Sequence, residues 1–365
     1  MINKEFWKGK KVFVTGHTGF KGSWLCLWLH SLGANITGYS LNPPSNPNLF
    51  DLCKINEITN SVIGDIRNYS LLNSVISTFD PDIIIHLAAQ PLVRESYSNP
   101  IETYETNVLG TVNVFEAVRA LSTNSNKRRA IVNVTSDKCY ENKEWLWGYR
   151  EDDKLGGYDP YSNSKACSEL VTSCYLQSFF YPNNPYGITL ASARAGNVIG
   201  GGDFATDRLI PDCVRSCLTK TEMIIRNPNS LRPWQHVLEP LSGYLLLAEK
   251  LYDDDFLYQG SWNFGPSEKD ALSVKTIVDM FIKEWGEPAN IKIEGDNDNH
   301  EAKILKLDCS KAKQLLGWEP CWAIEEAIDK VILWTKAFNM KQDLKKVCLG
   351  QIEEYEQKSG MGNKQ

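Results

Sequence analysis

The sequence predicts a doubly wound α/β fold, in which helices cover both faces of a parallel sheet, together with a smaller mixed α/β lobe. Three observations support this fold class. Near the start of the chain an apolar run, 12–14, leads through a glycine-containing turn into a helical pattern over 24–32. The run 83–87 is apolar except for His86, as expected of a parallel strand buried on both faces. Long helical patterns over 106–120 and 161–179 alternate with further strand patterns.

The turn after the first predicted strand contains Gly16, Gly19 and Gly22, spaced by three residues. Such a turn lets backbone N–H groups approach a pyrophosphate at the N-terminus of a helix, where the helix dipole also favours negative charge. The alternative is an ordinary turn with incidental glycines. The position of the turn, directly after a strand and before a helix, favours dinucleotide binding.

Composition limits the classes of partner. The chain has 365 residues, a hydrophobic fraction of 42% and a net charge of -6 without a basic tract, so we expect neither a nucleic-acid nor a membrane partner. The N-terminus has no apolar signal segment, and the ten cysteines contain no CxxC pair, so we expect free thiols and a cytoplasmic location. The five histidines are scattered, so we expect no metal.

The end of the second predicted strand, 34–40, is expected to meet the adenine ribose of a dinucleotide. Ser40 stands there in place of an acidic residue, and no nearby Arg or Lys is available for a 2′-phosphate, so we expect NAD rather than NADP. Asp65, in the next strand 61–67, could accept a hydrogen bond from the adenine amino group. It could equally cap the following helix, 69–77.

Polar groups follow the predicted strand 131–134, as Thr135, Ser136, Asp137 and Lys138. Ligands bind at the carboxyl ends of strands in open α/β sheets, although a solvated strand exit is the alternative.

Tyr161 and Lys165 are four residues apart and therefore share one face of the predicted helix 161–179. A protonated amine beside a phenol favours the phenolate, which makes tyrosine a usable base near neutral pH. This spacing is common by chance, but it is a strong signal after a glycine turn and a polar strand end.

The segments GHTGFKG, GDIR, HLAAQ, TSDKCY and YSNSK, in this order, resemble the extended short-chain dehydrogenase/reductase family, and the resemblance spans residues 10–320. Within this family the chain is similar to the nucleotide-sugar 4,6-dehydratases. Sugar epimerases lack an acid/base pair after the hydroxyl residue, dTDP-glucose dehydratases carry Asp-Glu, and the members that act on CDP-glucose carry Asp-Lys, as at Asp137 and Lys138. The resemblance implies a Rossmann domain, NAD as cofactor, CDP-glucose as substrate, and a role in deoxyhexose synthesis for lipopolysaccharide O-antigen.

The resemblance also implies a reaction in three steps. Tyr161 takes the hydroxyl proton at sugar carbon 4 while a hydride moves to NAD, Lys165 holds the nicotinamide ribose, and Ser136 hydrogen-bonds the same sugar oxygen. Water is then eliminated across carbons 5 and 6, with Asp137 as the acid and Lys138 as the base, or with these two roles exchanged. The hydride finally returns to carbon 6 while Asp137 or solvent supplies a proton at carbon 5, so that NAD is regenerated.

Two sets of binding residues are expected from the turn, the strand ends and the resemblance. The cofactor set is Gly16, His17, Gly19, Phe20, Gly22, Ser40, Asp65, Ile66, Leu87, Ala88, Ala89, Thr106, Thr135, Tyr161 and Lys165. The substrate set is Asn197, Arg208, Leu209, Ile210, Arg232 and Glu301, with Arg232 on the diphosphate. Arg215 and Arg226 are as consistent with surface charges as with phosphate binding.

The expected division of the chain follows from these motifs. Residues 1–198 form the NAD-binding domain, to which 234–265 return; 199–233 and 266–350 form the sugar-nucleotide lobe; and 351–365 form a polar tail. Because the predicted helices 106–120 and 161–179 are apolar on more than one side, we expect a homodimer or homotetramer.

Three alternatives remain at this stage. The chain could be an NAD-dependent nucleotide-sugar 4-epimerase, which the pair Asp137 and Lys138 opposes. It could be a dehydratase that acts on a dTDP or GDP sugar, because no physical argument identifies the base as cytosine. It could also be a catalytically inactive dinucleotide sensor that binds a partner protein, which the intact Ser136, Tyr161 and Lys165 oppose.

Overall fold

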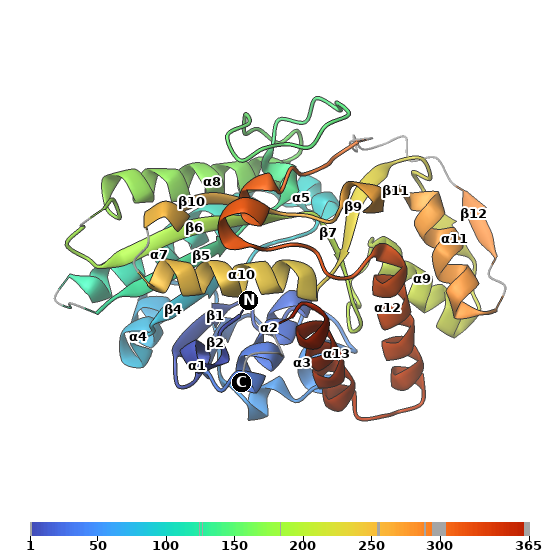
Figure 1. The fold of residues 1–365 in the computed structure, drawn as a ribbon, viewed down its shortest axis with the longest axis horizontal. Helices are drawn as coiled ribbons and strands as arrows, with labels where there is room; N and C mark the ends of the chain where they lie inside the picture. The colour runs from blue at the N-terminus through green and yellow to red at the C-terminus, as the bar shows by residue number, and fades with distance from the viewer. Residues whose placement is uncertain are drawn as a thin grey trace.

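The computed structural model describes residues 2–123, 125, 127–182, 184–253, 256–287, 290–293 and 304–360. Its largest element is a seven-stranded sheet of order β10-β6-β5-β4-β1-β2-β3, in which all neighbouring strands are parallel (Figure 1). The strands are β1 (Lys11–Thr15), β2 (Asn35–Ser40), β3 (Asn60–Ile63), β4 (Ile83–His86), β5 (Arg129–Val134), β6 (Ile188–Ala195) and β10 (Gly260–Phe264). The predicted parallel sheet is therefore confirmed.

Helices cover both faces of this sheet, as Figure 1 shows. One face carries α2 (Phe20–Ser31) and α10 (Leu238–Tyr252), and the other carries α4 (Tyr69–Phe79), α7 (Gly110–Ser122) and α8 (Pro160–Ser178).

Successive strand residues point to opposite faces, so each strand contributes to two hydrophobic cores. Val12 and Val14 pack in the core with α2 and α10, whereas Phe13 packs in the core with α4 and α7. In the same way, Ile83 packs in the core with α2 and α10, and Ile84 packs in the core with α4 and α7. This double burial is the physical reason for the continuous apolar runs in the sequence.

The segment before α7 differs in detail from the predicted helix 106–120. A π-helical turn, η2 (Glu105–Leu109), precedes α7 and follows the short helices α5 (Val93–Ser98) and α6 (Pro100–Tyr104). The other short helices are α1 (Lys4–Trp7), α3 (Leu49–Leu52), η1 (Ile55–Glu57), η3 (Asp137–Cys139), η4 (Phe256–Tyr258), η5 (Glu268–Asp270) and η6 (Ala312–Leu316).

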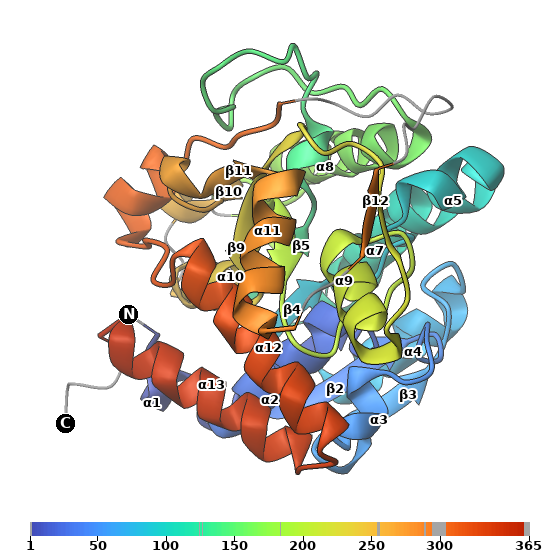
Figure 2. The ribbon, with the colours of Figure 1, turned by 90° about the vertical axis from the view of Figure 1, so that its right-hand side faces the viewer.

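A smaller lobe lies beside the carboxyl ends of the strands (Figures 1 and 2). It contains a mixed sheet of order β11-β9-β7 and a two-stranded parallel sheet, β12-β8. Its elements are β7 (Asn197–Ile199), α9 (Leu209–Thr219), β8 (Met223–Ile225), β9 (Leu231–His236), β11 (Ala271–Ser273), α11 (Val274–Trp285), β12 (Ile291–Ile293) and α12 (Ile324–Asn339). A hydrophobic core of its own, which includes Ile210, Phe281 and Ile328, joins α9, α11 and α12.

Residues 351–358, the first part of the predicted polar tail 351–365, are helical. Helix α13 (Leu344–Lys358) includes the buried side chains of Ile352 and Tyr355 and packs on α2. The Tyr355 ring contacts the Trp28 ring edge-on, with centroids 5.6 Å apart. Because the buried face of α13 is a narrow stripe in a mostly polar sequence, it has little signature of its own.

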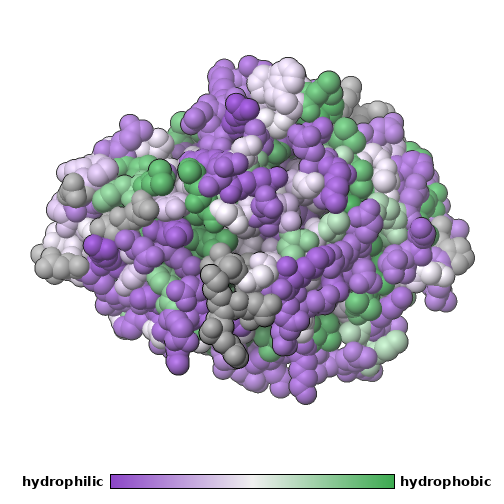
Figure 3. Space-filling model, viewed as in Figure 1, coloured by the Kyte–Doolittle hydropathy of each residue, from purple (hydrophilic) through white to green (hydrophobic). Residues whose placement is uncertain are grey.

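Three general properties complete the description. No helix among the described residues is both long and apolar enough to span a bilayer. The face shown in Figure 3 is largely hydrophilic, with hydrophobic residues in small separate patches. All ten cysteines are free thiols.

Candidate active site

The glycine turn between β1 and α2 is sterically closed to larger residues. Gly16 has φ +75°, and a Cβ there would lie 2.8 Å from the backbone nitrogen of Ala88, at the end of β4. A Cβ on Gly22 would lie 2.1 Å from the carbonyl oxygen of Gly16. Gly19 is the N-cap of α2 and offers no side-chain cap to the first-turn N–H groups. The turn therefore fits a pyrophosphate at the helix N-terminus.

His17 lies in the turn, but its side chain points into the protein. The imidazole is buried, with Nε2 2.7 Å from Ser61 Oγ, and a Cβ on Gly38 would collide with the ring. Burial lowers the pKa of His17 to about 4, so the ring is neutral at neutral pH. In this position the His17 side chain anchors the turn to β2 and β3.

The groups expected at the adenosine have partners within the protein. Ser40 Oγ lies 2.9 Å from the hydroxyl oxygen of Thr18, a residue that sequence reasoning missed. Asp65 forms an ion pair with Arg67 at 2.7 Å, and the hydrogen bonds from Arg67 lower the pKa of the Asp65 carboxyl. Ile66 is buried against Gly110, at the start of α7.

The end of β4 is fixed by hydrogen bonds from two elements. The backbone N–H groups of Leu87 and Ala88 each donate to Thr15 Oγ1 at 3.1 Å. Farther along the same loop, Asn107 in η2 accepts from the Gln90 N–H at 2.8 Å. Ala89 and Thr106 lie on this connection and are half-buried.

Five predicted catalytic residues come from two segments that meet beside the end of β5. Ser136, Asp137 and Lys138 belong to the turn that forms η3, and Tyr161 and Lys165 lie in the first turns of α8. Helix α8 begins in register because the side chain of its N-cap, Asp159, accepts a hydrogen bond from the N–H of Ser162 at 2.9 Å.

Hydrogen bonds connect the members of this cluster. The hydroxyl of Ser136 hydrogen-bonds the phenol of Tyr161 and lies 3.0 Å from Asp137 Oδ1. Lys165 Nζ donates to the carbonyl oxygen of Val134 at 3.3 Å. The carboxyl of Asp137 also has a buried oxygen, Oδ2, without a protein partner in the described part of the chain. A hydroxyl, a phenol and a carboxyl therefore lie together.

Burial dominates the ionisation of this cluster. It raises the pKa of Tyr161 to about 12, against a hydrogen bond from Ser136 and the charge of Arg208, and it lowers the pKa of Lys165 to about 8. We expected Lys165 to lower the pKa of Tyr161 and so favour the phenolate. In this structure the groups that lower the pKa of Tyr161 are Ser136 and Arg208.

The carboxyl of Asp137 is also controlled by burial. Desolvation raises its pKa, and the charges of Lys138 and Arg232 oppose this effect. A raised pKa favours the protonated carboxyl, which is the form that can act as a general acid.

Thr135 does not face this cluster. Its hydroxyl donates to the buried carboxylate of Glu169, which forms an ion pair with Arg194 at 2.8 Å. The side chain of Thr135 therefore belongs to the packing between β6 and α8.

The arginines of the second half divide into two groups. Arg232 is buried on β9, and Arg208, at the N-cap of α9, pairs with Asp203 at 3.0 Å; the charge of Arg232 acts on Asp137 and that of Arg208 on Tyr161. Arg215 and Arg226 instead hold the loop before α9. Arg215 donates to the carbonyl oxygens of Phe204 and Ala205 and also pairs with Asp212 on its own helix, and Arg226 pairs with Asp207 at 3.0 Å.

The remaining predicted substrate-binding residues lie in the smaller lobe, except Glu301. Asn197 pairs with Trp234 in the mixed sheet of the lobe. Leu209 and Ile210 begin α9, and Ile210 is buried in the core of the lobe. Glu301 lies outside the described residues.

Sequence reasoning also missed Lys21 and Tyr244. Lys21 follows Phe20 in the first turn of α2, and its Nζ lies 3.4 Å from the hydroxyl of the buried Tyr244 on α10. A lysine inside a glycine turn was the available signal for Lys21. For Tyr244, which lies in a buried apolar helix, the sequence offered none.

A Tyr161/Lys165 pair on one helix, beside a serine at the end of a neighbouring strand of a parallel dinucleotide fold, defines an extended short-chain dehydrogenase/reductase. The sequence profile of the GDP-mannose 4,6 dehydratase family matches residues 13–331, and the chain belongs to this family of NAD-dependent epimerases and dehydratases.

Individual relatives agree with this assignment. A CDP-glucose 4,6-dehydratase from Salmonella typhimurium is 53% identical over 357 residues, which cover 97% of this chain and 98% of the relative. A UDP-glucose 4-epimerase from Halalkalibacterium halodurans is 26% identical, over 89% of this chain and 95% of the relative. The fold matches that of a dTDP-glucose 4,6-dehydratase from Bacillus anthracis, crystallised in complex with NAD, with a TM-score of 0.75, 22% identity and coverage of 92% and 100% of the two chains.

Proposed function

We propose that this protein is an NAD-dependent CDP-glucose 4,6-dehydratase, a hydro-lyase that forms CDP-4-keto-6-deoxy-D-glucose and water. The observation that carries the proposal is the 53% identity with the Salmonella CDP-glucose 4,6-dehydratase over 97% of the chain. The Asp137-Lys138 pair, which opposes an epimerase, supports the proposal: it follows Ser136 in the turn that forms η3, and the charge of Asp137 acts on the phenol of Tyr161.

The glycine turn supports the binding of NAD. The N-terminus of α2 and the crowded glycines Gly16 and Gly22 suit a pyrophosphate, and Ser40 with Thr18 suits a ribose without a 2′-phosphate. When bound, NAD would accept a hydride from sugar carbon 4 and later return it to carbon 6.

The catalytic side chains have distinct proposed roles. Tyr161 removes the proton from the hydroxyl on carbon 4, Ser136 hydrogen-bonds the same oxygen, and Lys165 holds the nicotinamide ribose. The carbon 4 ketone acidifies the proton on carbon 5, which Lys138 removes. Asp137 protonates the leaving hydroxyl of carbon 6, a role supported by the burial that favours its neutral form.

The substrate diphosphate requires local positive charge, because the whole chain has a net charge of -6. Arg232 and Arg208 are proposed to provide it, since their charges already act on Asp137 and Tyr161. Asn197, Leu209, Ile210 and Glu301 stay predictions for the sugar-nucleotide site.

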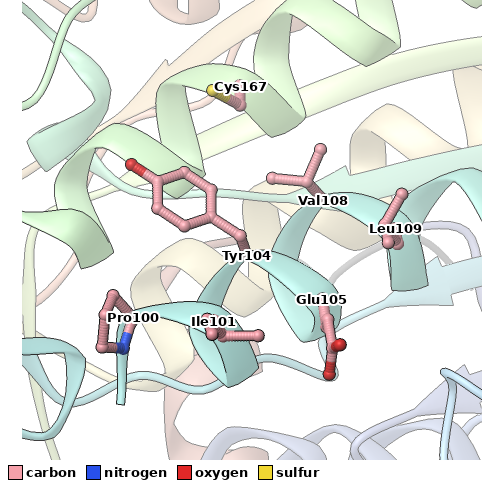
Figure 4. A pocket seen from close by; sticks show the side chains of 7 residues that line it. All are labelled: Pro100, Ile101, Tyr104, Glu105, Val108, Leu109 and Cys167. Carbon is pink, nitrogen blue, oxygen red and sulfur yellow. The ribbon is translucent and has the colours of Figure 1, made fainter. Parts of the chain in front are cut away.

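Self-association is proposed through an apolar groove of about 440 Å³ between α6, η2 and α8 (Figure 4). Pro100, Ile101 and Leu109 line one side and Cys167 lies across from them. Because Ile101 is 75% exposed and Leu109 is 56% exposed, a second copy of the chain is the proposed occupant, giving a homodimer or homotetramer. The free cysteines support a reducing compartment, the cytoplasm.

The function is tested by incubating the purified protein with NAD and, separately, CDP-, dTDP-, GDP- and UDP-glucose. We expect the alkali-induced absorbance of a 4-keto-6-deoxy sugar with CDP-glucose first. No product from any nucleotide would exclude a dehydratase, and a preference for dTDP- or GDP-glucose would exclude only the cytidine assignment. Conversion of UDP-glucose to UDP-galactose would instead indicate an epimerase.

A further inference from the structure

The η3 turn, residues 136–139, lies between two buried polar side chains. Thr135 directly precedes the turn at the end of β5, and Tyr140 directly follows it. Thr135 is 5% exposed and Tyr140 is 1% exposed, so both side chains are enclosed by protein. The turn therefore begins and ends at residues whose polar atoms need partners inside the protein.

The partners of both side chains are the two members of one buried ion pair. Glu169 on α8 and Arg194 on β6 approach to 2.8 Å, and their side chains are 1% and 2% exposed. Burial opposes the ionisation of Glu169, but the charge of Arg194 and the hydrogen bonds to the carboxylate lower the pKa of Glu169 below its ordinary value. Ser192 on β6 adds one of these hydrogen bonds, at 2.6 Å. The pair is thus charged and held in one geometry.

Each member of the pair holds one end of the turn. The hydroxyl of Thr135 donates to Glu169 Oε1, and Arg194 Nη1 donates to the hydroxyl oxygen of Tyr140 at 2.7 Å. The Tyr140 hydroxyl in turn donates to Asn263 Oδ1 on β10 at 2.8 Å. Both ends of the η3 turn are therefore attached to the same ion pair.

The ion pair is also part of the helix that carries the predicted base. Glu169 follows Lys165 by four residues and Tyr161 by eight, so the three side chains lie along one side of α8. The carboxylate of Glu169 consequently connects this side of α8 to the η3 turn.

We propose that Glu169 and Arg194 are positioning residues of the active site, which fix the η3 turn relative to α8 by holding both of its ends. The proposal rests on the dehydratase function proposed above. In that reaction α8 provides Tyr161 for oxidation at carbon 4, whereas the η3 turn provides Asp137 and Lys138 for elimination. A displaced turn should therefore slow elimination more than oxidation.

The links to the turn can be removed without removing a buried charge. Thr135→Val and Tyr140→Phe each delete one hydroxyl at nearly constant volume and leave the ion pair in place. With saturating CDP-glucose and NAD we expect kcat to fall about tenfold in each variant, with KM for CDP-glucose changed less than about twofold. Because oxidation continues while elimination is delayed, the NADH absorbance at 340 nm during turnover should rise at least about threefold above that of the wild type.

Matched controls are Tyr175→Phe and Thr189→Val. The Tyr175 hydroxyl donates to Glu116 at 2.7 Å, and the Thr189 hydroxyl donates to the carbonyl oxygen of Leu251 at 2.8 Å. Both controls should lower the melting temperature about as much as the test variants and leave the NADH absorbance during turnover at the wild-type level. If the test variants also lose only stability and show no additional NADH, their role is purely structural and the proposal is overturned.

A second test needs neither substrate nor NAD. Within the turn, the N–H of Cys139 donates to the carbonyl oxygen of Ser136 at 3.2 Å, so its hydrogen exchange reports how firmly the turn is held. In Thr135→Val and Tyr140→Phe we expect the peptide that contains residues 136–140 to exchange at least about fivefold faster than in the wild type. Exchange at the wild-type rate in both variants would overturn the proposal.

These readouts separate the two proposals. If the wild type forms no 4-keto sugar from any nucleotide, the dehydratase function fails while the exchange measurement still tests the positioning role. If the wild type is active and both test variants behave as the controls do, the positioning proposal alone fails. Should one test variant not fold by circular dichroism, the other tests its own end of the turn independently.

Discussion

Burial acts on Asp137 and Tyr161 in the same direction, but the consequences for the proposed reaction are opposite. It raises the pKa of both groups, which helps a carboxyl that must donate a proton and hinders a phenol that must accept one. The hydrogen bond from Ser136 and the charge of Arg208 partly offset the effect on Tyr161. The surroundings therefore favour the neutral form of both groups.

The role of Lys138 can be separated from that of Tyr161 by substitution. Lys138→Ala should still allow oxidation at carbon 4 but block elimination, so NADH should accumulate to about one equivalent per site on mixing with CDP-glucose, as 340 nm absorbance. Tyr161→Phe is the control and should form no NADH, with kcat reduced at least ~100-fold. If Lys138→Ala forms no NADH while the wild type turns over, Lys138 is not the base of the second step.

The sequence predicts how the proposed catalytic residues Tyr161 and Lys165 lie relative to each other, but it does not predict the side-chain contacts of the residues around them. Tyr161 and Lys165 share one helix, so their spacing alone places them on one face. Thr135 and His17 are polar residues at the end of β5 and in the glycine turn, where cofactor-binding residues were predicted. Their side chains instead contact Glu169 and Ser61, which are remote in sequence. The direction of a side chain depends on such distant partners, and the local sequence pattern does not identify them.

Among the elements, the glycine turn has the least steric freedom. Gly22→Ala would place a Cβ against the Gly16 carbonyl, a backbone atom that cannot move without shifting the turn. We expect a loss of about 3 kcal/mol in the free energy of unfolding and at least about tenfold weaker NAD binding. Denaturant titration and calorimetric NAD titration measure the two effects.

Gly350→Ala is the matched control for this prediction. Gly350 lies within α13, and a Cβ there meets nothing within 4 Å. Alanine should therefore stabilise the helix by about 0.5–1 kcal/mol and leave NAD binding unchanged. Equal stability of Gly22→Ala and the wild type would show that the turn tolerates a side chain.

Element prediction succeeded where one local pattern determines an element. Apolar runs in the sequence predict the buried strands β4 and β5, and the N-cap residue and helical periodicity predict α8. The helix α13 lacks such a pattern, because a few buried residues facing α2 stabilise it. Its existence depends on tertiary packing, which periodicity does not report.

At the scale of the whole molecule, the apolar groove along α6 and η2 predicts how copies of the chain associate. In a two-fold interface each substitution, Ile101→Glu or Leu109→Glu, would bury two charges, one from each copy. If each buried charge costs about 2 kcal/mol of association free energy, the dissociation constant of the dimer should rise roughly a thousandfold. Sedimentation velocity can measure this change. Leu333→Glu is the control, since Leu333 is exposed on α12, away from the groove. Unchanged association of both groove variants would exclude this interface.

The packing of α13 on α2 has a consequence for the synthesis of the protein on the ribosome. Trp28 and Cys53, near the start of the chain, are covered by Tyr355 and Cys348, which are translated more than 290 residues later. The first half of the sheet can pair its strands early, but this part of its core stays open until translation is almost complete. A chain that stalls late in translation would therefore present an exposed apolar surface to chaperones and proteases, even with every predicted catalytic residue already made.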